Sequence, residues 1–104
     1  MMIKVSVLYP GGSGKKFDHE YYSRTHMPMV QKKLGAPLKR MAVERGLSGG
    51  EAGSSPPFLA AGHLYFDSVE AFKGAFTPHA AEIMGDIPNY TNVTPVIQIS
   101  EVVL

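Results

Sequence analysis

Hydrophobic and polar residues alternate in four segments of the chain, and a spacing of two positions is typical of β-strands. These segments are residues 2–9, 38–47, 58–66 and 95–103. In the first of them, Ile3, Val5 and Val7 would share one face, while Lys4 and Ser6 would lie on the other. We therefore expect four short strands.

Two further segments repeat their apolar residues every three or four positions, which is typical of amphipathic helices. The first begins at Asp18, a residue type that caps helix N-termini well, and ends at Gly35, which favours helix termination. Because Pro28 falls inside this segment, we expect a kink or a break near Met27.

The second helical segment follows Asp67 or Ser68 and is interrupted by Pro78. We expect Thr77 to cap a new helical turn, with Pro78 at its first position. An interruption there would let the last part of the helix lean away from the sheet, which could open a pocket between the two layers.

The order of these elements, β-α-β-β-α-β, is that of a ferredoxin-like α+β fold, with one antiparallel sheet and both helices on one of its faces. The last two strands carry apolar residues on both faces, and a sheet with one wetted face should show a polar side. We therefore expect a homodimer in which a second copy covers Leu59, Ile97 and Ile99 on the open face, giving a barrel-like dimer. Residues 1–104 are predicted to form a single domain.

Composition narrows the classes of function. The formal net charge is +1, so no strong field attracts nucleic acid or an anionic membrane, and neither is an expected partner. The chain has no cysteine, which excludes disulfides and thiolate chemistry. No apolar run approaches the ~20 residues of a membrane span, and the N-terminus lacks a signal-peptide pattern. A cytoplasmic location is expected.

The main candidates for chemistry are the four histidines, His19, His26, His63 and His79. His26 follows Tyr22 by one helical turn, so both lie on the apolar face of the first helix. There His26 is either a hydrogen-bonded core residue or part of a pocket lining. His79 lies beside the predicted interruption of the second helix, and His63 faces the predicted dimer contact.

The loop from Asp86 to Thr91 gathers polar and aromatic side chains after the second helix. A loop of this composition either satisfies its own backbone or forms the rim of a pocket. Asp86 is a candidate to orient a histidine, since a carboxylate commonly has this role beside an imidazole. Tyr90 and Tyr22 are candidates to position a substrate by hydrogen bond or ring contact.

Together these segments resemble the EthD family. The residues that carry the resemblance are Phe17-Asp18, Tyr21-Tyr22, His26-Met27-Pro28, Phe66-Asp67-Ser68, Glu70-Ala71-Phe72 and Asp86-Ile87-Pro88-Asn89-Tyr90-Thr91. The family takes its name from ethyl tert-butyl ether degradation, where its founding protein accompanies a cytochrome P450 system. The resemblance implies a homodimeric α+β barrel without specifying a reaction. The segment Thr77-Pro78-His79 is similar to the one that holds the general base in some cyclases of the wider superfamily, which implies that role for His79.

Two hypotheses of function follow. The first is an isomerase, cyclase or oxygenase-like enzyme, without metal or organic cofactor, acting on a small, largely apolar ring-containing or carbonyl compound. His26 and His79 would exchange protons with it, and the residues binding it would be Tyr22, His63, Asp86 and Tyr90. The second is a non-catalytic accessory or carrier protein of a degradation pathway. A metal site built from three histidines is a weaker alternative, because no local ligand spacing supports it.

Overall fold

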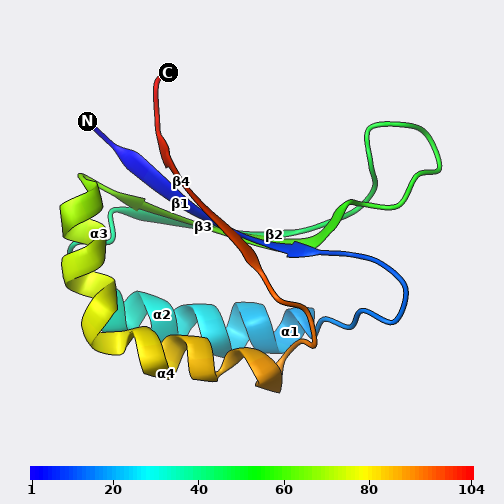
Figure 1. Ribbon diagram of the computed structural model, residues 1–104, viewed down its shortest axis with the longest axis horizontal. Helices are drawn as coiled ribbons and strands as arrows, with labels where there is room; N and C mark the ends of the chain where they lie inside the picture. Colours follow the sequence, from blue (N-terminus) through cyan, green and yellow to red (C-terminus); the bar gives the residue numbers. More distant parts are fainter.

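The computed structural model describes residues 1–104 as a four-stranded sheet with one layer of helices against it (Figure 1). The strands are β1 (Ile3–Pro10), β2 (Arg40–Arg45), β3 (Phe58–Phe66) and β4 (Val96–Glu101). They pair antiparallel in the order β2-β3-β1-β4. The predicted ferredoxin-like α+β arrangement is confirmed.

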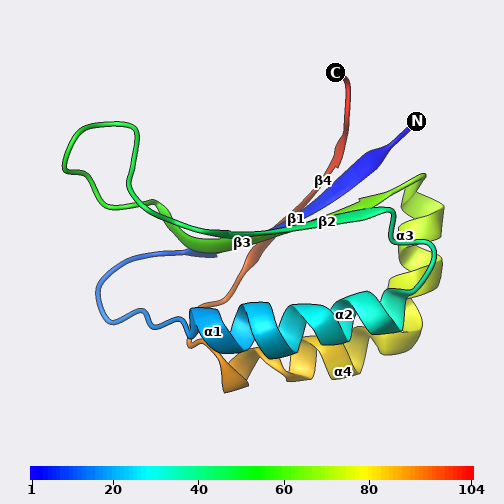
Figure 2. The same cartoon turned by 180° about the vertical axis from the view of Figure 1, so that it is seen from behind.

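The helical layer consists of two nearly continuous helical rods that lie on the same face of the sheet (Figure 2). The first contains α1 (His19–Tyr21), the π-helical turn η1 (Tyr22–His26) and α2 (Met27–Leu34). The second contains α3 (Val69–Phe76), the 3₁₀ turn η2 (Thr77–His79) and α4 (Ala80–Gly85), followed by the 3₁₀ turn η3 (Ile87–Asn89). None of these helices is both long and apolar enough to cross a membrane.

The first rod begins and ends where the sequence predicts. The Asp18 carboxylate accepts a hydrogen bond from the Tyr21 N–H at 3.0 Å, and Gly35 ends the rod with a φ of +67°. The predicted break is instead a π-turn, in which the Met27 N–H bonds to the Tyr22 carbonyl five residues back. Pro28 has no N–H to offer to the previous turn, which explains why the regular pattern is interrupted here.

The second rod bends at η2, between α3 and α4, as Figure 1 shows. Ser68 caps α3 by accepting a hydrogen bond from the Ala71 N–H. Pro78 lies in the first turn of η2 as predicted, but the prediction that Thr77 caps it is wrong. Thr77 has helical backbone angles and makes no side-chain cap. The bend follows from the missing N–H of Pro78 rather than from a new cap.

The register of the sheet decides which side chains face the helices. Val5 in the centre of β1 pairs with Leu64 in β3 and with Ile99 in β4, and Val7 pairs with Ile97. Val5 and Leu64 are buried in the core, so Ile99, which pairs with Val5, and Ile97, two positions before it, also point to the helix side. The prediction that these two isoleucines lie on the open face is therefore wrong. They are still 48% and 42% exposed, because β4 is an edge strand that the helices cover incompletely.

The opposite face of the sheet, here called the open face, is more polar than the sequence analysis predicts. By register it carries the residues Lys4, Ser6, Leu8, Arg40, Ala42, Glu44, Ala61, His63, Tyr65, Val96, Gln98 and Ser100. Many of its polar groups bond within the chain. The His63 ring bonds to the Ser6 hydroxyl at 2.9 Å and to the Glu44 carboxylate at 3.0 Å.

Candidate functional site

A cavity of about 80 Å³ lies between the helix layer and the sheet. Its walls are almost entirely apolar, with His26 the one lining residue outside the hydrophobic class. Among the others are Tyr9 and Tyr22. Ile97 and Met84 also line it, and both are about half exposed. The cavity is therefore reached from the edge of the sheet, between β4 and α4.

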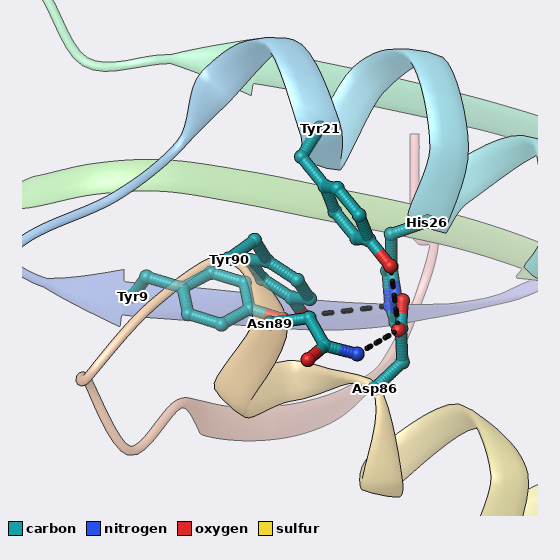
Figure 3. A network of polar contacts seen from close by, with 6 residues as sticks. All are labelled: Tyr9, Tyr21, His26, Asp86, Asn89 and Tyr90. Atoms are coloured by element: carbon teal, nitrogen blue, oxygen red, sulfur yellow. Dashed lines mark hydrogen bonds and ion pairs between the residues drawn. The ribbon is translucent and has the colours of Figure 1, made fainter.

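His26 is positioned by the π-turn and by a carboxylate from the other rod. Its side chain is 4% exposed, and its Nδ1 lies 2.9 Å from Oδ2 of Asp86, the residue that follows α4 (Figure 3). The Tyr21 hydroxyl and the Asn89 amide donate to the other oxygen of Asp86, at 2.7 and 2.8 Å. With both oxygens occupied, the carboxylate is fixed in place at the Nδ1 edge of the ring.

The Asp86 carboxylate determines which nitrogen of His26 carries the proton. Burial by itself raises the pKa of Asp86, but bonds from Asn89, His26 and Tyr21 outweigh it and hold that pKa below its usual value. Asp86 is then ionised and can only accept, so His26 donates from Nδ1. Burial lowers the pKa of His26 despite the opposing effect of Asp86. At neutral pH the ring is thus neutral, with a lone pair on Nε2.

Tyrosine hydroxyls continue the chain of hydrogen bonds beyond Nε2. The Tyr90 hydroxyl lies 3.4 Å from Nε2 of His26 and 2.6 Å from the Tyr9 hydroxyl (Figure 3). Burial raises the pKa of Tyr90 and of Tyr22, so both phenols stay protonated and act as neutral donors. The contact to Nε2 is long, and the basic lone pair of His26 is only weakly engaged.

Tyr22 reaches the sheet because the residue opposite it is a glycine. Tyr22 is 1% exposed and its ring stacks on His26 with centroids 5.6 Å apart. Its hydroxyl lies over Gly62 of β3, so closely that a Cβ at that position would overlap it. Gly62 thus makes room for the phenol against the floor of the cavity.

The structure brings together four of the predicted site residues, His26, Tyr22, Asp86 and Tyr90. His79 is half-buried in η2 and does not line the cavity, so its role as a base stays a prediction without a geometric partner. His63 lies on the open face, on the other side of the sheet from His26. Histidines so separated cannot share a metal ion, and no group of three potential ligands lies together anywhere in the chain.

Sequence reasoning missed three members of the network, Tyr9, Tyr21 and Asn89. Tyr9 read as an ordinary inward strand residue, although its hydroxyl bonds to a residue 81 positions away. Tyr21 precedes the apolar stripe of the helix, and no role at the site was predicted for it from the sequence. The π-turn that follows it helps Tyr21 and His26 reach the same carboxylate, and no local sequence signal marks such a turn.

These features define a class, the ferredoxin-like α+β proteins, with a buried His–Asp pair beside a cavity under the helices. The EthD domain model matches residues 11–94, and the chain belongs to this family. The chain has no match among curated proteins.

Solved structures agree with this assignment. An EthD-like protein from Ralstonia eutropha is 50% identical, with a TM-score of 0.94 over 99% of this chain and 93% of its own. An ethyl tert-butyl ether degradation (EthD) family protein from Bacillus halodurans is 24% identical, with a TM-score of 0.66 over 97% and 98%. A dimeric ferredoxin-like protein of unknown function from Thermobifida fusca shares the fold at 17% identity, with a TM-score of 0.66 over 98% and 92%.

Proposed function

We propose that the protein binds a small apolar carbonyl compound in the cavity and transfers protons to and from it through His26. The observation that carries this proposal is the Nδ1 bond from His26 to Asp86, which leaves Nε2 as the basic nitrogen of a ring that lines an apolar cavity. A base held in one tautomer by a third group is the usual arrangement for general base catalysis. The cavity, at about 80 Å³, is smaller than the ~150 Å³ engineered cavity that binds benzene, so we expect a compound smaller than benzene.

Exchange of carbon-bound hydrogen tests this proposal without knowledge of the natural substrate. Butanone is incubated in D₂O with the protein, and deuterium uptake next to the carbonyl is followed by NMR. We expect uptake about 10²-fold or more above that with free imidazole at equal concentration, because the positioned base acts on a bound ketone. A rate equal to that of imidazole would contradict the proposal.

The almost wholly apolar wall of the cavity favours one second candidate, a carrier for a hydrophobic compound. This function requires binding without chemistry. If butanone binds saturably but its hydrogens exchange no faster than with free imidazole, the carrier function is supported and the enzymatic function is contradicted.

The exchange rate should depend on pH through His26. Burial lowers the pKa of its ring below the usual 6.5, so the basic form persists into mildly acidic solution. We expect a rate that is level near neutral pH and falls only below pH 6.5, as the ring takes up a proton. Asp86 opposes the shift, so Asp86→Asn should move the fall to still lower pH and reduce the plateau. A fall centred above pH 6.5 would exclude His26 as the base.

We further propose that the protein forms a homodimer through the open face, as a single-domain protein of the cytoplasm. The relatives described as dimeric support a dimer, although at 15% and 17% identity their likeness shows the fold alone. Polar groups on the open face do not oppose association, because His63 is already bonded on both sides within the chain. Mixed polar and apolar composition is ordinary for such interfaces.

Sedimentation at micromolar concentration checks the dimer. Leu8→Glu places a charge on the open face beside Ala61, and we expect it to shift the wild-type dimer to monomer. Ala81→Glu adds the same charge at an exposed position of α4 and should leave the dimer unchanged. Dimers that persist in Leu8→Glu would place the contact elsewhere.

A further inference from the structure

The polar groups of the cavity lining indicate which kind of ligand it can bind. His26 is the one lining residue outside the hydrophobic class, and the lining has no lysine, arginine, aspartate or glutamate. Asp86 keeps the proton of the ring on Nδ1, so Nε2 can receive a hydrogen bond and cannot give one while the ring is neutral.

The Tyr90 hydroxyl, which now contacts Nε2, can give up this contact at a small cost in free energy. The Tyr90 hydroxyl approaches Nε2 only to 3.4 Å, and the Tyr90–Tyr9 contact is 2.6 Å, with either oxygen able to donate. If a ligand takes Nε2, Tyr90 can turn its proton to Tyr9, and the Tyr90 hydroxyl keeps a partner. Tyr90 does not line the cavity itself, whereas His26 does, so the ring is reachable from the cavity.

The charge of the site selects against ions. The carboxylate of Asp86, held at the Nδ1 edge of the ring, disfavours an anion, and the lining has no cation to compensate one. A cation would lose its hydration in an apolar cavity without a direct charged partner, which is costly. A neutral compound incurs neither penalty.

We infer that the ligand of this cavity is a small neutral molecule that donates a hydrogen bond from an O–H or N–H group to Nε2 of His26. A carbonyl compound would make this bond only as its enol, so the keto form that starts the exchange reaction would bind less tightly than the enol. This inference rests on the proposed function of the cavity as a binding site, and it specifies which chemical group of the ligand His26 recognises.

Pyrrole and furan form a matched pair for the test. Both are neutral five-membered rings, and only pyrrole carries an N–H donor. We expect pyrrole to bind about tenfold more tightly than furan, as one buried hydrogen bond allows. Pyrrole-2-carboxylate keeps the donor but adds a negative charge, and we expect at least tenfold weaker binding than pyrrole. Equal affinities for pyrrole and furan, no binding of either, or preference for the carboxylate would each overturn the inference.

A spectroscopic readout avoids dependence on a variant that fails to fold. In protein with ¹⁵N-labelled histidine, pyrrole should shift the Nε2 signal of His26 while Nδ1 keeps its proton, and furan should leave Nε2 unchanged. A shift at another histidine instead would overturn the inference. This test is independent of the test for catalysis. If the protein prefers pyrrole to furan but does not exchange butanone hydrogens, the proposed enzymatic function is wrong and the inferred ligand preference still holds.

Discussion

We expect the replacement of His26 by alanine or glutamine to lower butanone exchange by about 10²–10⁴-fold, the contribution of a positioned general base. Alanine removes the ring altogether. Glutamine fills part of its volume, and its amide can still donate to Asp86, but it has no basic nitrogen. We therefore expect glutamine to preserve the fold better than alanine while losing the rate equally. NMR exchange assays on both variants, with circular dichroism to check folding, measure these effects.

The matched control is His19→Ala, which removes a histidine of the same rod that does not line the cavity. It should exchange butanone like the wild-type protein. His79→Ala tests the role that the sequence assigned to His79, and an unaltered rate would remove that role. Full exchange activity in His26→Gln would end the assignment of His26 as the base.

Gly62→Ala should lower the free energy of unfolding by about 1–3 kcal/mol, which is the usual cost of an added carbon in a well-packed core. The new Cβ would overlap the Tyr22 hydroxyl. It would lie 3.2 Å from the Met27 methyl and 3.6 Å from Cζ of Tyr22, the ring carbon that carries the hydroxyl. A strand glycine replaced by alanine should otherwise gain stability slightly, so a loss points to this contact. Urea denaturation of the two proteins measures the difference.

The colliding atom is a single oxygen, which permits a rescue experiment. Tyr22→Phe removes that oxygen and keeps the ring, so the double variant should recover most of the stability lost in Gly62→Ala. The two changes would then be strongly non-additive, as expected for side chains in direct contact. Additive losses would show that the hydroxyl does not lie over Gly62.

The elements of the fold were predictable because each depends on local chemistry. The alternation in residues 58–66 matches β3 to the residue, and Asp18 and Gly35 mark the ends of the first rod. The face of β4 was not predictable in the same way. Both faces of that strand are apolar, and only its pairing with Val5 and Val7 shows which one meets the helices.

The site was predictable in its parts but not in its connections. The spacing of Tyr22 and His26 placed both on the inner side of a helix, and Asp86 was recognised as a carboxylate able to orient a histidine. That the histidine is His26 depends on the fold, because 60 residues separate the two. His79 attracted attention by its place beside Pro78, yet the bend there directs Phe76 and Met84 to the cavity instead.

The π-turn also governs which changes in chain length this protein can accept. Deleting one residue within Tyr22–His26, such as the exposed Thr25, would remove the extra residue that the π-turn accommodates. A regular helix could then form with Val30 and Leu34 still in the core, while Tyr22 and His26 would be three positions apart instead of four and their ring stacking would change. A relative with one residue fewer here would therefore keep the core of the fold and differ at the His26 site.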